Sequence, residues 1–346
     1  MTATPVPPLR QAIRQLAMGG SLSEPQAREA FGIVMRGEAT PAQVAALLVG
    51  LRVKGETAEE VAGAADALRG AMVRLPAERP DLLVDTCGTG GGSVGTFNIS
   101  TAAALLAAGL GVRIAKHGNR SFTSQCGSAD VLEALGVPID VSVEVMERAL
   151  REAGIVFMFA PLMHPAMRHV GPVRSELAIP TVMNIVGPLA NPASAGRQVV
   201  GVADAARVPL IAGALRSLGA VHALVVHGAP GMDEVSPLGP TNVVEIRDGA
   251  TSQWSIDPIS LGFAPGRVEE LAGGPPAENA AAVLAVLRNE APPTAVAAVV
   301  LNAAAALYVS GSGPNDFADA VDVARDGLRK GAGIDALDRL RDAYTR

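Results

Sequence analysis

From residue 80 onward, short runs of β-branched and apolar residues alternate with alanine-rich stretches. The runs cover residues 82–85, 112–115, 155–159, 198–202 and 221–226. Apolar runs of this length, bounded by turn residues, are typical of buried strands. Strands that alternate with helices form a largely parallel sheet, and its ligands bind at the carboxyl ends of the strands. The pattern therefore predicts an α/β domain with a mostly parallel central sheet.

The first 75 residues lack such runs and carry repeated helix-start signals. Ser23 stands before Glu24 and Pro25, Thr40 before Pro41 and Gln43, and Thr57 three residues before Glu60, which are patterns that mark a helix N-terminus. Apolar residues recur at helical spacing, which gives one apolar face that serves either as core or as a dimer surface. This region is expected to form a small helical domain.

A second helical stretch, rich in proline, interrupts the alternation over about 164–190 and is expected to pack back onto the N-terminal helices. The predicted division is therefore a small helical dimerisation domain over 1–75, together with 164–190, and a large α/β domain over 76–163 and 191–346.

Composition excludes several classes of protein. Hydrophobic residues make up 49% of the chain and charged residues 18%, which is too apolar for a disordered chain. A net charge of −6 gives no basic footprint for nucleic acid. The longest apolar runs, 102–112 and 295–309, are shorter than the roughly 18 residues that span a bilayer. Cys87 and Cys126 show no CxxC pattern. We expect a cytoplasmic protein that binds neither nucleic acid nor membrane.

The densest motif is DTCGTGGGSVGTFNIST, residues 85–101, where a strand runs through five glycines into a helix. Glycines let backbone N–H groups surround an anion, and the helix N-terminus adds partial positive charge. The motif lacks the Gly-Lys-Ser/Thr of a Walker A loop and fits the dinucleotide pattern poorly. It predicts a phosphate or pyrophosphate cradle, the alternative being a structural turn.

A second polar loop, AKHGNRSFTSQCGSAD, follows the next predicted strand at residues 115–130. Lys116, His117, Asn119 and Arg120 place cations and an amide together, as in a polyanion site. Two such loops at successive strand ends of one sheet would converge on one ligand.

Asp233 and Glu234 follow a later strand in a loop rich in glycine and proline. Mg²⁺ is commonly held by one or two carboxylates together with substrate phosphates. Alone, such a pair is most often a solvated turn, but beside two anion loops it predicts a metal site.

Histidines, arginines and methionines are mixed over residues 157–192, among them His164, Met167 and Arg174. A pocket with apolar walls and a cation would suit an aromatic carboxylate. The alternative is that these are satisfied structural residues.

Taken together, these motifs resemble the anthranilate phosphoribosyltransferases of tryptophan biosynthesis. GTGGxxxxTFNIST, KHGNRS, GSADVLEALG, FAPxxHPAMRHVxPVR, NxxGPLxNP and HGxxGxDE occur in the family's order over nearly the whole chain. The resemblance implies a homodimer with a small helical domain hinged to a large α/β domain of the nucleoside-phosphorylase type. It also implies Mg²⁺-dependent transfer of phosphoribose from phosphoribosyl pyrophosphate (PRPP) to anthranilate.

The resemblance also implies residue roles. PRPP would be bound by Gly88, Thr89, Gly90, Gly91, Thr96, Asn98, Ser100, Thr101, Lys116, Asn119, Thr123 and Ser124. Anthranilate would be bound by Gly88, Asn119, His164, Met167 and Arg174, with Arg174 facing its carboxylate. Ser100, Asp233 and Glu234 would hold one or two Mg²⁺ ions, and His117 would be a proton acceptor.

Two positions depart from the family pattern. Gly92 stands where much of the family has Asp, and Gln125 where a basic residue is common. We expect weaker binding of one Mg²⁺ or of PRPP as a result. The alternatives are a non-catalytic or nucleic-acid-binding relative on the same scaffold, and a pyrimidine nucleoside phosphorylase.

Overall fold

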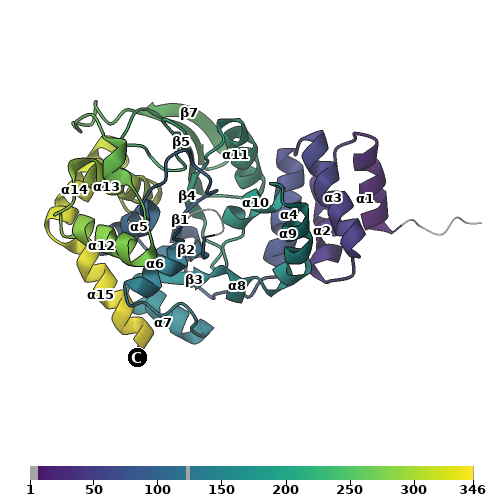
Figure 1. Cartoon of the computed structure of the whole chain (residues 1–346), viewed down its shortest axis with the longest axis horizontal. Coiled ribbons are helices and arrows are strands. Elements are labelled where there is room, and N and C mark those ends of the chain that lie inside the picture. The colour runs from purple at the N-terminus through teal and green to yellow at the C-terminus, as the bar shows by residue number, and fades with distance from the viewer. Residues whose placement is uncertain (1–6, 122–124, 346) are drawn as a thin grey trace, which may run out of the picture. The chain divides into compact units, whose positions relative to one another are not determined.

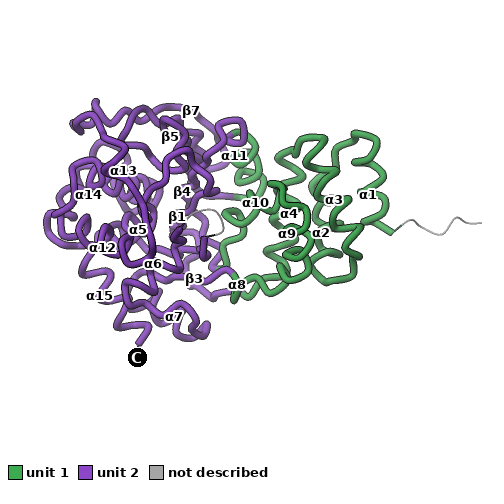
Figure 2. The backbone as a smooth tube through the Cα atoms, viewed as in Figure 1, with its two compact units in different colours: residues 1–73, 161–192, 209–219 green, residues 74–160, 193–208, 220–346 purple. Residues whose placement is uncertain are grey.

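The structure is a computed structural model that describes residues 7–121 and 125–345. The chain forms two compact units, coloured separately in Figure 2. Unit 1 consists of the described residues up to 73 with 161–192 and 209–219, and unit 2 of those within 74–160, 193–208 and 220–346.

Unit 1 is helical, and its helices begin where the sequence signals them. Ser23, Thr40 and Thr57 each form a capping box with the Gln or Glu three residues later, which satisfies backbone donors at the helix start. The helices are α1 (Pro8–Ala17), α2 (Glu24–Met35), α3 (Pro41–Lys54), α4 (Ala58–Gly70), α8 (Ala160–Met163), α9 (Gly171–Leu177), α10 (Met183–Val186) and α11 (Val208–Ser217).

Residues 209–219 belong to unit 1, although the sequence placed them in the large domain. One point of approach lies between α11 and the first residue of α4. A Cβ added at Gly213 would lie 2.7 Å from the Cβ of Ala58, so the glycine allows the two helices to approach closely.

Unit 2 is built on a seven-stranded sheet, and the predicted fold class is confirmed (Figure 1). Its order is β3-β2-β1-β4-β5-β6-β7, in which β1 to β5 run parallel and β6 and β7 antiparallel. The strands are β1 (Val84–Gly88), β2 (Ile114–Gly118), β3 (Ile155–Phe159), β4 (Arg197–Gly201), β5 (His222–Gly228), β6 (Thr241–Arg247) and β7 (Ala250–Ile256).

The order of the strands reverses between β1 and β4, which are neighbours in the sheet. The chain moves outward from β1 to β2 and β3, and then from β4 to β5 on the other side. Such a switch point leaves a crevice at the carboxyl ends of the two strands, where open α/β sheets bind ligands. The glycine-rich segment follows β1 at this position.

The core of unit 2 contains two alanine-rich helices, α5 and α13, which contact each other and the sheet. Small side chains allow helices to pack closely. In the part of the chain that the structure describes, no helix is long and apolar enough to cross a membrane. The helices of unit 2 are α5 (Ile99–Gly109), α6 (Ser128–Ala134), α7 (Val143–Glu152), α12 (Pro276–Leu287), α13 (Pro293–Val309), α14 (Phe317–Arg329) and α15 (Ala332–Thr345).

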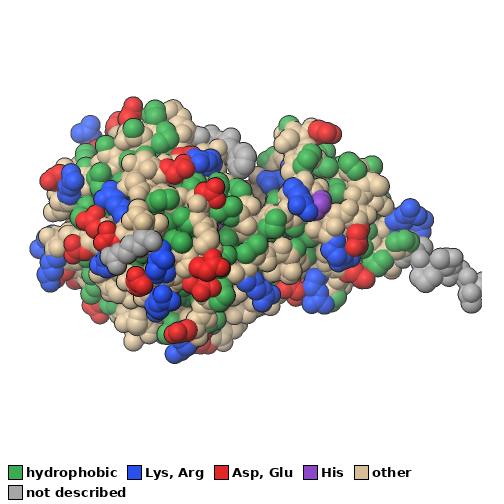
Figure 3. Space-filling view, turned by 90° about the horizontal axis from the view of Figure 1, so that it is seen from below, with side chains coloured by type: hydrophobic (Ala, Val, Ile, Leu, Met, Phe, Trp, Pro, Cys, Tyr) green, Lys and Arg blue, Asp and Glu red, His purple; other side chains and the backbone are tan. Residues whose placement is uncertain are grey.

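Acidic and basic side chains are interspersed on the face of the molecule that Figure 3 shows. No broad area of one sign covers the coloured residues on that face.

Candidate active site

Four of the five parallel strands end in a glycine: Gly88, Gly118, Gly201 and Gly228. A Cβ at Gly88 would lie 2.5 Å from Oδ2 of Asp233, and one at Gly201 only 1.7 Å from the backbone oxygen of Asp233. These glycines therefore let the acidic loop lie directly on the ends of β1 and β4. Sequence reasoning missed Gly201 and Gly228, and a glycine closing successive predicted strands is the signal that would have found them.

The glycine-rich loop after β1 is anchored on both sides. The N–H of Thr89 donates to the carbonyl of Gly201 at 2.9 Å, and the N–H of Gly90 donates to Oδ2 of Asp233 at 2.8 Å. Gly90 and Gly91 have φ values of 69° and 77°, which side chains disfavour. The loop thus holds one carboxylate of the acidic pair by a backbone donor, in the way it would hold an anion.

A cationic side chain lies buried beneath this loop. Lys116 is 3% exposed, and its Nζ donates to the carbonyl of Thr86 at 2.5 Å and to Oγ of Ser100 at 3.2 Å. Burial lowers the pKa of Lys116, while Asp85 and Glu234 act in the opposite direction. The predicted diphosphate ligand is therefore within the same cluster as the predicted metal ligand Ser100.

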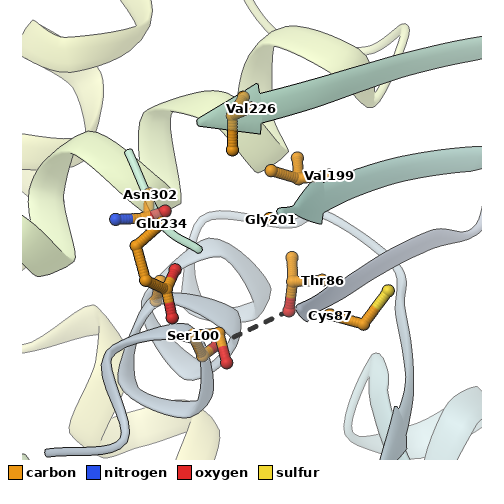
Figure 4. A pocket seen from close by; sticks show the side chains of 9 residues that line it. Thr86, Cys87, Ser100, Val199, Gly201, Val226, Glu234 and Asn302 are labelled. Atoms are coloured by element: carbon orange, nitrogen blue, oxygen red, sulfur yellow. Dashed lines mark hydrogen bonds between the residues drawn. The ribbon is translucent and has the colours of Figure 1, made fainter. Parts of the chain in front are cut away.

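Glu234 lines a small cavity with Thr86 and Ser100, as Figure 4 shows. Burial, and then the charge of Asp233, raise the pKa of Glu234 to about 8, against the attraction of Lys116 and a hydrogen bond from the backbone of Ser100. Burial also raises the pKa of Asp233. Two neighbouring carboxylates whose charged forms repel each other are stabilised by a cation.

The start of α5 is fixed by an asparagine from α12. The Nδ2 of Asn279 donates to Oδ1 of Asn98 at 2.9 Å, and the Nδ2 of Asn98 donates to the carbonyl of Cys126 at 3.3 Å. Thr96 forms an isolated antiparallel bridge with Ala272. Thr101 is buried, and among the described residues its Oγ1 has no hydrogen-bond partner.

The loop after β2 offers fewer free cations than its sequence suggests. Arg120 is paired with Asp130 at 2.7 Å and Glu133 at 2.6 Å, so its charge is already compensated. The backbone N–H of His117 donates to Asp85 at 3.2 Å, and Oδ1 of Asn119 accepts from the N–H of Arg120 at 2.7 Å. Thr123 and Ser124 lie outside the described residues.

The predicted anthranilate residues His164, Met167 and Arg174 lie in unit 1, whereas Gly88 and Asn119 lie in unit 2. His164 is buried, and burial lowers its pKa to about 4 against a hydrogen bond to the backbone of Ala190. It is therefore neutral at pH 7. Burial also lowers the pKa of Arg174, which remains a cation.

Known proteins match this chain over nearly its whole length. The glycosyl transferase family, a/b domain, matches residues 80–334, and the glycosyl transferase family, helical bundle domain, matches residues 10–72. The anthranilate phosphoribosyltransferase of Rubrobacter xylanophilus is 49% identical over 332 residues, which cover 96% of each chain. The chain belongs to the anthranilate phosphoribosyltransferase family.

Solved structures of the anthranilate phosphoribosyltransferase family agree with the fold of this chain. The Thermus thermophilus member matches with a TM-score of 0.91 and 41% identity, covering 97% of this chain and 99% of that one. The Saccharomyces cerevisiae member in complex with PRPP and Mg matches with a TM-score of 0.87 and 26% identity, covering 97% and 98%. The yeast protein has also been solved with 4-fluoroanthranilate, at a TM-score of 0.86 with 97% of both chains covered.

Membership of the anthranilate phosphoribosyltransferase family confirms the predicted enzyme class, a transferase of pentosyl groups, and the predicted activity. The nucleic-acid-binding and nucleoside phosphorylase alternatives receive no support from these relatives. The roles of individual site residues stay predictions.

Proposed function

We propose that the chain joins the amine nitrogen of anthranilate to the ribose of PRPP and releases pyrophosphate. The observation that carries this proposal is the acidic pair Asp233–Glu234, held on the glycine-rich loop beside Lys116. A pyrophosphate leaving group needs cations and backbone donors at this place, and the switch point of the sheet is where an α/β fold can provide them.

A magnesium ion fits the residues present. Among the described residues, no three of His, Cys, Asp and Glu lie close enough to hold a metal by themselves. Asp233, Glu234 and the hydroxyl of Ser100 would instead hold one or two ions together with ligand oxygens, the usual arrangement for Mg²⁺. The raised pKa of Glu234 supports this assignment, because burial and a neighbouring carboxylate make its charge unfavourable without a cation. When bound, Mg²⁺ would offset the charge of the departing pyrophosphate.

The rest of the PRPP site would come from the loops after β1 and β2. Gly88, Thr89, Gly90 and Gly91 would present backbone N–H groups to the pyrophosphate, and Lys116 would add a positive charge. Thr96, Asn98, Thr101 and Asn119 would complete this site, and Thr123 and Ser124 would bind the 5′-phosphate side. Asn98 is held by Asn279 and Cys126, so its side chain is preorganised.

Anthranilate would be recognised by an apolar wall and a cation. Arg174 is half-buried, and among the described residues no hydrogen bond or ion pair engages its guanidinium. It is thus available to pair with a carboxylate, a contact that Arg makes with two parallel hydrogen bonds. Met167 would contact the ring. His164, neutral at pH 7, would line the site without competing for the carboxylate.

The chemistry requires little beyond alignment and electrostatics. The lone pair of the aniline nitrogen forms a bond to the ribose carbon as the bond from that carbon to pyrophosphate breaks. The nitrogen then loses a proton, for which His117 is the candidate acceptor. A neutral amine is already a nucleophile, so no strong base is needed to begin, and positioning of the two reactants supplies much of the rate.

The test follows the decay of anthranilate fluorescence with purified protein, PRPP and Mg²⁺. We expect decay that depends on PRPP and that is lost in Arg174→Ala and in the double variant Asp233→Ala/Glu234→Ala. Decay that persists in both variants would reject the assigned sites. Absence of decay in the wild-type protein, with PRPP still bound, would reject anthranilate as the acceptor. We also propose a homodimer that works in the cytoplasm.

A further inference from the structure

Helix α13 carries an isolated polar residue in its buried interior. Asn302 is 4% exposed and is preceded and followed by buried alanines and leucine. Asparagine is a poor helix former, and a buried amide is unfavourable unless it is hydrogen-bonded. A buried Asn in an otherwise apolar helix therefore needs hydrogen-bond partners for its amide group.

The partner is the backbone directly after the acidic pair. Oδ1 of Asn302 accepts from the N–H of Val235 at 2.9 Å, and its Nδ2 donates to the carbonyl of Val235 at 2.9 Å. Nδ2 also donates to the carbonyl of Ala298 at 2.9 Å, one turn back on the same helix. One side chain thus satisfies both backbone groups of Val235, as a neighbouring strand would.

This contact holds the backbone next to Glu234. The N–H of Val235 belongs to the peptide unit that Glu234 begins, so the two-point contact holds the backbone on the carboxyl side of Glu234. On the other side, Asp233 is held by the N–H of Gly90 and lies against Gly201. Asn302 and Glu234 both line the cavity shown in Figure 4. Helix α13 therefore holds, through Asn302, the backbone from which the Glu234 side chain reaches the cavity.

We propose that Asn302 is a positioning residue, which holds the Asp233–Glu234 loop in the conformation that binds Mg²⁺ with PRPP. The inference rests on the proposed function, because it assigns the purpose of the loop to that metal. Residues that orient metal ligands without touching the metal commonly change metal affinity by about 10–100-fold when they are replaced. A residue that only stabilises the fold would lower stability and leave metal affinity unchanged.

Two substitutions distinguish the loss of the amide's hydrogen bonds from the loss of side-chain volume. Asn302→Leu keeps a similar size and suits a buried helix, whereas Asn302→Ala leaves space, and both remove the contacts to Val235. The matched control is Ser310→Ala at the end of the same helix. Ser310 is 2% exposed, and among the residues that the structure describes its hydroxyl bonds only to Leu307, Ser312 and Gly313.

The first readout is direct binding of Mn²⁺, a spectroscopic substitute for Mg²⁺, to protein that holds PRPP, measured by electron paramagnetic resonance. We expect the Mn²⁺ dissociation constant to rise at least about tenfold in both Asn302 variants and to stay unchanged in Ser310→Ala. The second readout is steady-state activity. The Mg²⁺ concentration for half-maximal rate should rise by the same factor, with the KM for anthranilate within about twofold.

Asn302→Gln tests rescue, because it keeps the amide one methylene further out. It should recover part of the Mn²⁺ affinity that Asn302→Leu loses. It also serves as the test variant if Asn302→Leu and Asn302→Ala fail to fold. Wild-type Mn²⁺ affinity in folded Asn302→Leu or Asn302→Ala, or no loss in Asn302→Gln where it alone folds, would overturn the inference. Failure of the proposed function is a separate outcome, since wild-type protein would then show no PRPP-dependent loss of anthranilate.

Discussion

Two glutamates in unit 2, the half-buried Glu234 and the buried Glu245, have opposite environments. Glu245 lies on β6 and accepts hydrogen bonds from the His222 ring at 2.7 Å, Trp254 Nε1 at 2.8 Å and Tyr308 OH at 3.1 Å. Glu234 is beside a second carboxylate, and its pKa is raised to about 8 by burial and by Asp233. One carboxylate has its donors within the protein, and the other has a repulsive neighbour.

The contrast separates a structural carboxylate from the one that is proposed as a metal ligand. A buried polar group that is fully hydrogen-bonded favours a single packing arrangement. Around Glu245, the aromatic rings of His222, Trp254, Tyr308 and Phe317 contact one another. A carboxylate whose charged form is unfavourable in the free protein is instead stabilised when a cation binds beside it. Each glutamate should therefore fail in a different assay when its charge is removed.

The largest effect is expected for Glu234→Gln. The change keeps the shape of the side chain, and with a pKa of about 8 the ligand-free Glu234 is already largely neutral at pH 7, so the stability of the ligand-free protein should be nearly unchanged. Activity should fall about 100-fold or more, because the charge that holds the metal is lost. Anthranilate fluorescence decay and urea unfolding measure the two quantities on one preparation. Wild-type activity in this variant would remove Glu234 from the metal site.

Glu245→Gln should give the reverse result. The Gln side chain has one oxygen that accepts and one NH₂ group that donates, whereas His222, Trp254 and Tyr308 all donate to Glu245. At least one donor would lose its acceptor, so the free energy of unfolding should fall by about 2–3 kcal/mol. The kcat should stay within about twofold of wild type, since the hydrogen-bond partners of Glu245 are His222, Trp254 and Tyr308, none of which is a predicted site residue. Urea unfolding followed by circular dichroism checks the first expectation, with Glu234→Gln as the matched control. A loss of activity without a loss of stability would contradict this assignment.

His164 extends the comparison to a buried base in unit 1. Its pKa is lowered to about 4 by burial, so on acidification the unfolded chain takes up this proton before the folded protein does. The stability contributed by neutral His164 is complete above about pH 6.5 and is lost as the pH falls towards 4. His164→Gln should therefore lose about 3 kcal/mol less stability than wild type between pH 7 and pH 4. Equal acid sensitivity of the two proteins in urea unfolding would show that His164 does not titrate in this way.

The fold could be predicted largely from local signals. Capping pairs such as Ser23 and Gln26 mark helix starts by chemistry within four residues, and buried strands appear as continuous apolar runs. The hairpin β6–β7 was missed, although Asp248 and Gly249 between its strands adopt φ values of 49° and 80°. An Asp-Gly pair between alternating residues is a strong hairpin signal, and it was available in the sequence.

The sequence allowed the motifs of the candidate site to be predicted, but not the contacts between their side chains. That Asp233 and Glu234 belong with the glycine-rich loop followed from both lying after strands. Three of the site's contacts could not be predicted. Asn302 and Val235 are 67 positions apart, and Arg120 is paired with Asp130 and Glu133, which are 10 and 13 positions away. The burial of Lys116 depends on the neighbouring strand β1. Such tertiary contacts leave no local signal in the residues themselves.

The smallest expected effect concerns Gly92, which stands where much of the family has Asp. A Cβ at Gly92 would lie 3.1 Å from Oδ1 of Asp233, so an added carboxylate would join the acidic pair. Gly92→Asp should lower the Mg²⁺ concentration for half-maximal activity by about threefold, with kcat within about twofold. Gly92→Asn is the control, because it adds nearly the same volume without the charge and should not strengthen Mg²⁺ binding. Identical Mg²⁺ curves for Gly92→Asp and wild type would mean that the Asp233–Glu234 pair alone sets the metal affinity, and that the glycine at this position does not weaken it.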